Sequence, residues 1–451
     1  MLSKLIYQLD EKPAGKVLWL STMQWFIFMI ANLITIPIVL GHAFALTEYE
    51  TAMMTSRTLL LCGMVCFLQA LVGHKYPILE GPAGMWWGVF LILLQMRRDG
   101  GGSGDLLLRE LELGLMAGSM IFILLAVCNL IGKIKGLFTP AVTGTFLILL
   151  AIQVSKSLLQ GMLGIGFQGS ETVKPLIALL SVLLIGLMIG VMKKGKGIVQ
   201  NISVLIGLLA GWGLYAVLGL VSEIQSTETG LVLPEIFPFG SPVMNWGIVV
   251  TSAITSVILL SNLIASIQVF AKVSGVPATN AIFSRGVLVS GIGTFLAGCF
   301  GTIGIVPQTA AASLVSLTGI ASRLPFLLSS ILVALLGLFP QAGQWLATIP
   351  APVGYAVLFT VFCQLLGFGL RDIQSLSLNQ RDIFIVGFSI LTGSGSLFID
   401  GKAWAEFPSV FGFILGNGLI VGVIMVIVLE HLIFRKTKKE PLYSGSSQIT
   451  S

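Results

Sequence analysis

The chain contains fourteen apolar stretches that are long enough to cross a lipid bilayer. A transmembrane helix needs about 20 consecutive apolar residues, and within lipid only helices and closed barrels satisfy every backbone N–H and C=O group. Charged residues make up 10% of the chain, against about 25% in soluble domains. The sequence therefore predicts an all-α polytopic membrane protein. The predicted spans are 17–41, 55–73, 77–95, 113–132, 138–157, 175–192, 201–221, 247–271, 281–301, 303–320, 324–345, 350–370, 383–400 and 408–431.

Glycine and proline interrupt two of these spans, the third and the tenth. Pro77–Gly88 reads PILEGPAGMWWG, and Gly301–Arg323 reads GTIGIVPQTAAASLVSLTGIASR. A broken helix is tolerated in a bilayer only where protein or a water-filled cavity satisfies the freed backbone groups. Broken segments at corresponding places in the two halves of a transporter point to its substrate site. We therefore expect two inverted seven-span repeats, residues 1–221 and 247–434, joined by a polar loop at 222–246.

Basic residues are distributed unevenly between the two sides of the predicted membrane. With both termini cytoplasmic, 18 Lys and Arg residues lie in inner segments and 7 in outer ones, which accounts for all 25. Cytoplasmic loops carry such an excess, so the distribution supports fourteen spans and a cytoplasmic basic tail at 435–451. A twelve-span protein that lacks two neighbouring weak spans remains the alternative. The same bias explains the net charge of +6, so no nucleic-acid partner is expected.

Glu80 is the one acidic residue that falls well inside a predicted span, within the interrupted third one. A charge in the bilayer is costly, so an intramembrane carboxylate is a functional-site hypothesis by default. We expect Glu80 to accept hydrogen bonds from N–H groups of a ligand or to exchange a proton during transport. The alternative is a third span that starts later, which leaves Glu80 near the inner interface beside His74 and Lys75.

Histidines, cysteines and catalytic motifs give no indication of a metal, a cofactor or an enzyme. His42, His74 and His431 all fall at span ends, so none is expected to form an intramembrane proton relay. Cys62 and Cys66 share a helix face, but no histidine or carboxylate joins them, and we expect all five cysteines to be inert apolar thiols. The absence of a nucleotide-binding P-loop argues against an ATP-driven pump within this chain.

Further polar side chains are concentrated in the first, eighth and tenth predicted spans. For each one, the alternative to a substrate contact is a hydrogen bond between helices. Trp86 and Trp87 are candidates for stacking on a flat ligand, or for an ordinary position at the membrane interface. The polar candidates are Gln24 and Asn32 on the first span, Ser261, Asn262, Ser266 and Gln268 on the eighth, and Thr302, Gln308, Thr309 and Ser313 on the tenth.

Four segments of the chain carry a family resemblance. YQLDEKPAGKVLWLSTMQWFIFMIANLITIPIVLG, AKVSGVP, SLTGIASR and LFPQAGQWLATIPAPVGYAVL follow one another as in the uracil–xanthine permease family, also called nucleobase–ascorbate transporters. The chain resembles this family over most of its length. The resemblance implies a core domain (17–132 and 247–345), a gate domain (138–221 and 350–431), and short antiparallel strands in the broken spans with the substrate between them. It also implies a homodimer in a cell membrane of bacterial type.

Several positions that resemble the family's substrate site carry different residues here. The carboxylate that the family places on the eighth span corresponds to Asn262, and an acidic or amide position on the tenth span corresponds to Ala310. The aromatic position of the third span falls at Gly84. By contrast, Glu80 precedes the third-span glycine, Gly81, at a place where the family commonly has an uncharged residue. We therefore hypothesise that the carboxylate of the site has moved from the eighth span to the third.

These observations together predict a secondary active transporter that takes up a purine- or uracil-type nucleobase, with proton rather than sodium symport favoured. Two alternatives stay open. An anion transporter on the same fold would suit the positive N-terminal ends of broken helices, although the negative charge of Glu80 opposes it. The other is a membrane sensor or structural protein without transport. The predicted substrate-binding residues are Gln24, Glu80, Gly81, Trp86, Ser261, Asn262, Ser266, Gln308, Thr309 and Ala310, with Glu80 also the predicted proton-coupling residue.

Overall fold

The computed structural model describes residues 5–99, 103–137, 139–195, 203–221, 231, 233–399, 403 and 409–435. Within these ranges the chain is helical, apart from two three-residue strands and the connecting loops. The predicted basic tail lies outside the described residues except for Arg435, and so does most of the first part of the predicted loop between the repeats.

Helices of the first half start at recognisable local signals. Thr47 and Glu50 form a capping box at the start of α3, and Pro140 and Pro175 occupy the first turns of α7 and α8, where a missing N–H is tolerated. The elements are α1 (Gly15–Leu33), α2 (Thr35–Ala43), α3 (Glu48–Leu71), β1 (Glu80–Pro82), α4 (Gly84–Asp99), α5 (Gly104–Val127), α6 (Ile131–Ile134), α7 (Pro140–Met162), α8 (Pro175–Lys194) and α10 (Ser203–Val217).

The second half repeats this pattern of long helices around one short strand. Side chains of Asn245 and Thr279 cap the first helices, α11 and α12, by accepting backbone N–H bonds. The elements are α11 (Trp246–Ser274), α12 (Asn280–Cys299), β2 (Ile305–Pro307), α13 (Ala310–Thr318), α14 (Arg323–Leu336), α15 (Pro340–Ala347), α16 (Ala351–Gln374), α17 (Gln380–Leu397), α18 (Ser409–Gly416) and α19 (Gly418–Val428), which ends in a π-helical turn at Leu429–Ile433.

Eight helical segments of the described chain are long and apolar enough to cross a membrane, or nine if α14 and α15 count as one bent span. The bend between these two helices is 88°. Other predicted spans consist of shorter pieces: β1 with α4, β2 with α13, and α18 with α19. The protein is therefore a multi-pass helical membrane protein.

The fourth predicted span, 113–132, is displaced from the helix that forms it, because α5 begins at residue 104. The sequence suggested a polar loop here, but Glu110 and Glu112 are only 5% and 2% exposed. Arg97 forms an ion pair with Glu110, and the Asn245 amide donates to Glu110 Oε1 at 3.1 Å. Partners from other segments thus compensate the charge of Glu110. The expectation that Glu80 alone would be a carboxylate buried within a span was wrong.

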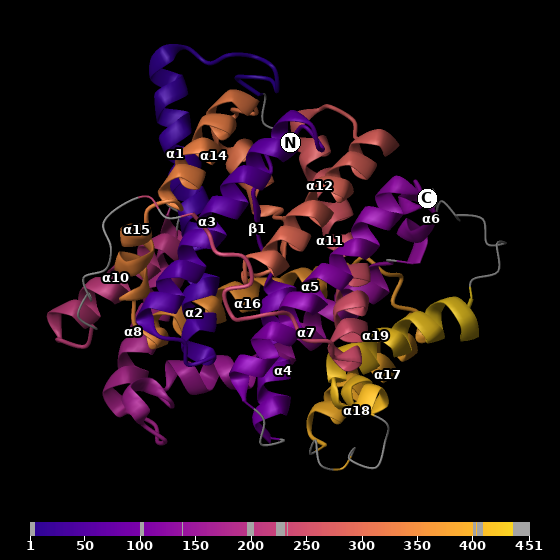
Figure 1. Ribbon diagram of the computed structural model, residues 1–451. Helices are drawn as coiled ribbons and strands as arrows, with labels where there is room; N and C mark the ends of the chain where they lie inside the picture. The colour runs from indigo at the N-terminus through magenta and orange to yellow at the C-terminus, as the bar shows by residue number, and fades with distance from the viewer. Residues whose placement is uncertain are drawn as a thin grey trace, which may run out of the picture.

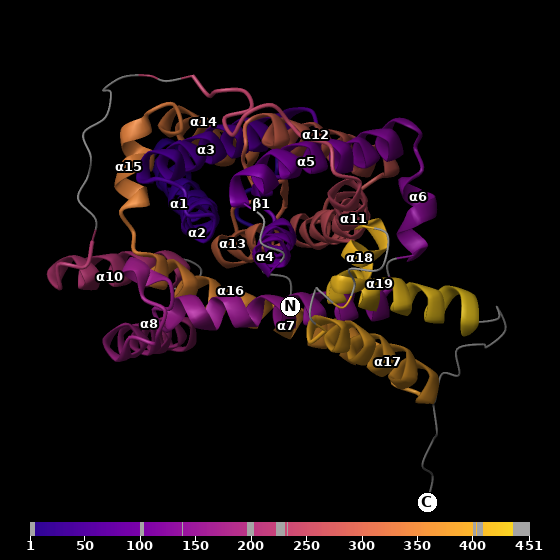
Figure 2. The same ribbon diagram turned by 60° about the horizontal axis from the view of Figure 1, so that its bottom comes forward.

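The helices form two layers, which Figure 2 shows one above the other. In the first layer α5 packs against α11 and α12, while α14 packs against α1 and α3. In the second layer α7 packs against α16, α17 and α19, and α8 packs against α10 and α16. Each layer therefore combines helices from both halves of the chain, as the mixture of indigo, magenta and orange ribbons in Figure 1 also shows. The layers meet where α2 contacts α16 and α4 contacts α7.

The N-terminal segment forms hydrogen bonds with the loop between α13 and α14. Backbone N–H groups of Ile6 and Ala321 donate to Gly319 O and Tyr7 O at 2.7 and 2.9 Å, so two extended strands of chain lie in parallel. Arg323 N donates to Leu9 O at 3.0 Å. The turn that follows α13 is therefore held by the beginning of the chain, which limits how α13 can move.

Candidate functional site

The two broken spans meet as an antiparallel strand pair in the interior of the first layer. Gly81 is opposite Val306, and all six residues of the two strands are buried. Ala83 N donates to Gly304 O at 2.9 Å, and Gln308 N donates to Leu79 O at 2.8 Å. Because α4 and α13 begin only a few residues beyond the strands, the N-terminal ends of two helices lie near the strand pair. Such helix ends carry partial positive charge.

Gln308 extends over the glycine of the opposite strand. A Cβ atom placed on Gly81 would lie 2.7 Å from Gln308 Nε2 and 3.0 Å from Leu33 Cδ2. The Gln308 amide therefore occupies the space that the missing side chain leaves. Gln308 and Thr309 are partly exposed, and Ala310 is exposed at the first position of α13. This edge of the strand pair offers an amide and the N-terminal end of α13 to a ligand.

Two of the three predicted residues on α11 reach the same strand pair. Ser266 Oγ donates to Pro307 O at 2.9 Å and lies 3.2 Å from Asn262 Oδ1. Ser266 is buried, whereas Asn262 is partly exposed. Ser261 instead donates to Ile258 O of its own helix at 2.7 Å and makes no contact of this kind with the strands. Asn262 is thus a partly exposed α11 side chain that is linked to β2 through Ser266.

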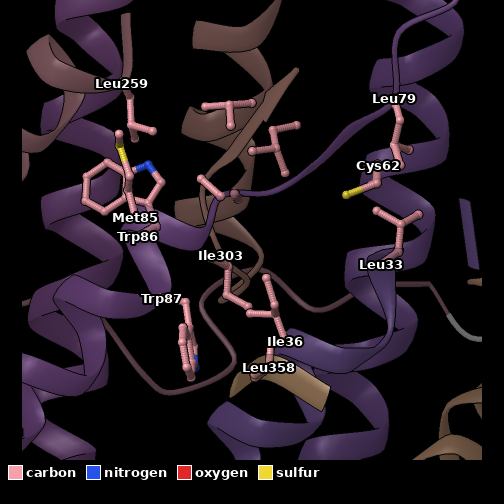
Figure 3. Close-up of a cluster of buried hydrophobic side chains, with 14 of the residues drawn as sticks. Leu33, Ile36, Cys62, Leu79, Met85, Trp86, Trp87, Leu259, Ile303 and Leu358 are labelled. Carbon is pink, nitrogen blue, oxygen red and sulfur yellow. The ribbon is translucent and has the colours of Figure 1, made fainter. Parts of the chain in front are cut away.

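Both tryptophans of the third span are fully buried. A Cβ on Gly304 would clash with the Trp86 ring, so the absence of a side chain at this position leaves room for the indole. Figure 3 shows Trp86 beside Met85 and Leu259, with the Trp87 ring apart from them. The Trp87 and Phe362 ring centroids are 4.9 Å apart, which joins α4 to α16 of the second layer. In this conformation Trp86 packs between helices, and its ring has no face free for a ligand.

Gln24 lies on α1, away from these contacts. It is partly exposed, and within the described part of the chain it makes no hydrogen bond to the strand pair. Its neighbour Trp25 is buried and packs edge-on against Phe326 at a centroid distance of 5.0 Å. The structure therefore brings Gly81, Gln308, Asn262 and Ser266 together, and it leaves Gln24 outside their hydrogen bonds.

The Glu80 carboxylate is fully buried and faces α3 and α12. Gln69 Nε2 donates to Oε1 at 3.0 Å, and Ser290 Oγ donates to Oε2 at 3.2 Å. His74 Nε2 lies 3.4 Å from Oε1. The backbone of Glu80 is also fixed, because its N–H lies 3.1 Å from Cys66 Sγ. This carboxylate is bonded within the protein and has no exposed surface for a substrate.

Two partners of Glu80 were missed by reasoning from the sequence. Gln69 and Ser290 lie on different helices, 11 residues before and 210 residues after Glu80, so only the fold brings them together. His74 was read as a residue at a span end, but it is fully buried. It follows the end of α3, and its Nε2 lies 3.4 Å from the Glu80 carboxylate. The alternative prediction placed Glu80 near the inner interface beside His74 and Lys75, and of this the structure shows the contact with His74.

A two-layer helical membrane protein whose broken spans pair at its centre has the architecture of a solute transporter. The sequence profile described as the permease family matches residues 16–402. The chain belongs to this permease family, which confirms the resemblance found in the sequence. It is a transporter and not an enzyme.

Curated relatives match nearly the whole chain. It is 32% identical over 436 residues to "Putative purine permease YwdJ" of Bacillus subtilis, which covers 95% of this chain and 99% of that protein. It is 26% identical to "Uric acid permease PucJ", with 95% of each chain covered, and 23% identical to "Xanthine permease", with 94% and 96% covered, both also of Bacillus subtilis.

Solved structures support the fold. The transmembrane domain of the cyanobacterium bicarbonate transporter BicA matches with a TM-score of 0.61 and 16% identity, covering 94% of this chain and 99% of that one. The murine Slc26a9 anion transporter, in its inward-facing state, matches with a TM-score of 0.65 and 13% identity, covering 94% and 69%. The arrangement of helices is therefore one that transporters of different solutes share.

Proposed function

We propose that this protein is a secondary active transporter that takes up a purine-type nucleobase, with uracil-type bases as the wider class. The names of its relatives, which refer to purine, uric acid and xanthine, support this substrate class. A flat base presents alternating N–H donors and carbonyl or ring-nitrogen acceptors on its edge. Recognition therefore requires an amide and backbone groups on a rigid support.

The observation that carries the proposal is the Gln308 amide lying over Gly81 at the edge of the buried strand pair. An amide offers one acceptor and two N–H donors, which matches adjacent positions on a base edge. Asn262 supplies a second amide from α11, and its Oδ1 lies 3.2 Å from Ser266 Oγ, whose single proton is shared between this oxygen and Pro307 O of β2. Thr309 and the exposed Ala310 complete this edge at the N-terminal end of α13. Gly81 gives the room that this arrangement needs.

Glu80 is assigned the coupling proton and not a substrate contact. Its complete burial and its bonds to Gln69 and Ser290 support this assignment. The strand that carries Glu80 also carries Gly81, so a change of charge on Glu80 acts directly on the backbone under Gln308. Proton binding is thereby linked to the site without direct contact between the carboxylate and the base.

Fourteen spans in two inverted repeats are proposed for the whole chain, with a core domain (17–132 and 247–345) that moves against a gate domain (138–221 and 350–431). The helix contacts support this, because contacts between two spans are matched by contacts between the spans that lie seven places away in the other repeat. The contact of α3 with α14 corresponds to that of α12 with α5, and α1 with α14 corresponds to α11 with α5. The contacts of α17 with α7 and α8 with α16 form a similar pair.

Membrane orientation and assembly follow the same proposal. The excess of basic residues on one side supports cytoplasmic termini in a cell membrane. In the proposed gate domain, α8 exposes a row of large apolar side chains, including Leu176, Leu179, Leu183 and Leu187. Lipid covers this row in a monomer, and a second copy of the chain covers part of it in the proposed homodimer.

An anion is the second candidate substrate because the two solved transporters that share the fold carry bicarbonate or other anions by their titles. The helix starts of α4 and α13 near the strand pair would favour a negative charge. The burial of Glu80 weakens the earlier argument against an anion, since its carboxylate is bonded on the far side of β1 to α3 and α12.

Uptake in cells that lack their own permeases distinguishes these substrates. Radiolabelled uracil, xanthine, hypoxanthine, guanine and uric acid are compared with radiolabelled bicarbonate, with and without a proton uncoupler, at matched expression. We expect saturable, uncoupler-sensitive uptake of a purine base, loss of coupling in Glu80→Gln, and a raised KM in Gln308→Ala. Uptake of bicarbonate alone would refute the nucleobase proposal.

A further inference from the structure

Glu80 lies in a cluster of four buried side chains, Gln69, His74, Glu80 and Ser290, that the strand-pair site does not use. We propose that His74 is the positioning residue that stabilises the charged form of Glu80, and that the Ser290 hydroxyl reverses its hydrogen bond when Glu80 takes up the proton. This inference rests on the proposed function, because it takes Glu80 as the proton site.

The tautomer of His74 follows from its hydrogen bonds. The Tyr76 backbone N–H donates to His74 Nδ1 at 3.1 Å. A ring nitrogen that accepts a hydrogen bond carries no proton, so in the neutral ring the proton is on Nε2. His74 Nε2 is fully buried and meets no other hydrogen-bond partner among the described residues. The acceptor in front of it is Glu80 Oε1 at 3.4 Å, a separation that can shorten when the carboxylate is charged.

Every polar side chain around the carboxylate offers a donor. Gln69 Nε2 and Ser290 Oγ lie 3.0 and 3.2 Å from the two carboxylate oxygens, and His74 supplies the third donor, its Nε2–H. Gln69 Oε1 is already occupied by the His74 backbone N–H at 3.2 Å. Amide and imidazole N–H groups have no lone pair for a sodium ion, which binds oxygen ligands. The cluster therefore suits a carboxylate that exchanges a proton.

The other groups near Glu80 do not compete for this proton. From α3 the thiols of Cys62 and Cys66 approach it, and both are fully buried. Within the ranges that the structure describes, Glu80 has no ion-pair partner other than His74. On this side of the strand pair, the charge of the cluster therefore depends on Glu80 and His74 alone.

Proton uptake requires one rotation, that of the Ser290 hydroxyl, which reverses the hydrogen bond between Ser290 and Glu80. A proton from water that binds Glu80 Oε2 turns this atom into a donor, and Ser290 Oγ at 3.2 Å becomes its acceptor. The Ser290 hydroxyl proton then turns to the carbonyl four residues earlier on α12, Gly286 O, as serine hydroxyls in helices commonly do. Gly286 O already accepts from Gln69 Nε2 at 3.0 Å and from the backbone N–H of the next helical turn, so the Ser290 hydroxyl shares this carbonyl with them. Release of the proton to water restores the first arrangement.

Two substitutions at His74 distinguish the roles of its two ring nitrogens, Nδ1 and Nε2. His74→Gln keeps an N–H near the position of Nε2, toward Glu80, whereas His74→Asn keeps only an acceptor near Nδ1 for the Tyr76 N–H. Both variants are compared with the wild type, Glu80→Gln and Tyr76→Phe. Tyr76→Phe removes the phenol bond to Val276 O and leaves the His74 contacts in place. The readout is initial uptake of radiolabelled xanthine, or of another of the five bases that the wild type takes up, against external pH.

We expect His74→Gln and Tyr76→Phe to keep the wild-type pH profile. In His74→Asn, half-maximal uptake moves to higher pH by about one to two units, because the charged form of Glu80 loses a hydrogen bond. Glu80→Gln should have no pH dependence. His74→Ala serves as a second variant without the donor if the asparagine variant does not reach the membrane.

The outcomes distinguish this inference from the function on which it rests. A flat Glu80→Gln profile together with an unshifted His74→Asn profile overturns the role of His74 alone. Equal shifts in His74→Asn and His74→Gln also overturn it, since both would then reflect a structural effect. A wild-type profile in Glu80→Gln overturns the proton site and the role of His74 together.

Discussion

Replacement of Gly81 by alanine tests the contact between the strand pair and Gln308. The new Cβ would lie 2.7 Å from Gln308 Nε2 and 3.0 Å from Leu33 Cδ2. Gly81 is absent from the glycines with positive φ among the described residues, so its backbone accepts alanine. The atom that must move is the end of a flexible amide side chain. We therefore expect the substitution to displace the Gln308 amide and to leave the strand pair intact.

The expected effect is on substrate affinity. A displaced amide loses a hydrogen bond to the base, which contributes about 0.5–1.5 kcal/mol. This corresponds to a rise in KM of about two- to thirteenfold. The assay measures initial uptake over a range of base concentrations at matched expression, and thermal unfolding of the purified protein in detergent. Gly190→Ala is the matched control, because a Cβ at Gly190 meets nothing within 4 Å.

A double-mutant cycle decides whether Gly81 acts through Gln308. If it does, the variant with both Gly81→Ala and Gln308→Ala has the KM of Gln308→Ala alone, since the amide is already absent. Effects of the two substitutions that multiply would refute this reasoning. So would a wild-type KM in Gln308→Ala.

Three further outcomes follow from the packing. Gly304→Ala forces the Trp86 ring aside, and overpacking of this kind costs about 1–3 kcal/mol; a thermal unfolding midpoint equal to that of the wild type would contradict this. Asn245→Ala removes the N-cap of α11 and the amide that donates to the buried Glu110, so it should lower stability by about 1–3 kcal/mol with an unchanged KM, as measured by unfolding and uptake together. Cys128 is exposed, so the expectation that every cysteine is an inert apolar thiol was wrong for this residue; a membrane-permeable maleimide should modify it and spare the buried Cys62 in the native protein, which mass spectrometry of the labelled peptides can check.

Span positions could be predicted from the sequence because apolar length is a local property. The ends of α8, α11 and α12 lie within a few residues of the predicted limits. The error at α5 has a physical cause, since Glu110 looks like a loop residue until Arg97 and Asn245 are seen to bond to it. A charged residue marks the end of a membrane span only when water solvates its charge, and at Glu110 other side chains do so instead.

The site was predictable in its backbone and less so in its side chains. Gly81 and Gln308 belong to the two broken segments, so the pattern of glycine and proline predicted that both lie at one substrate site. Trp86 was a plausible stacking residue, but Gly304 on the other broken span leaves room for its ring in the interior. The partners of Glu80 could not be predicted, because Ser290 comes from a helix that the sequence separates from it by 210 residues.

The pairing of β1 with β2 has a consequence for how the protein is synthesised. Residues 80–82 leave the ribosome long before residues 305–307, and until then the backbone groups of β1 have no partner strand. In lipid each unpaired group costs several kcal/mol. The third span therefore has to stay shielded during translation until most of the second half has been made. A chain that stops after the first repeat lacks a stable third span, whereas the two halves synthesised separately in one membrane hold the groups needed to complete each other.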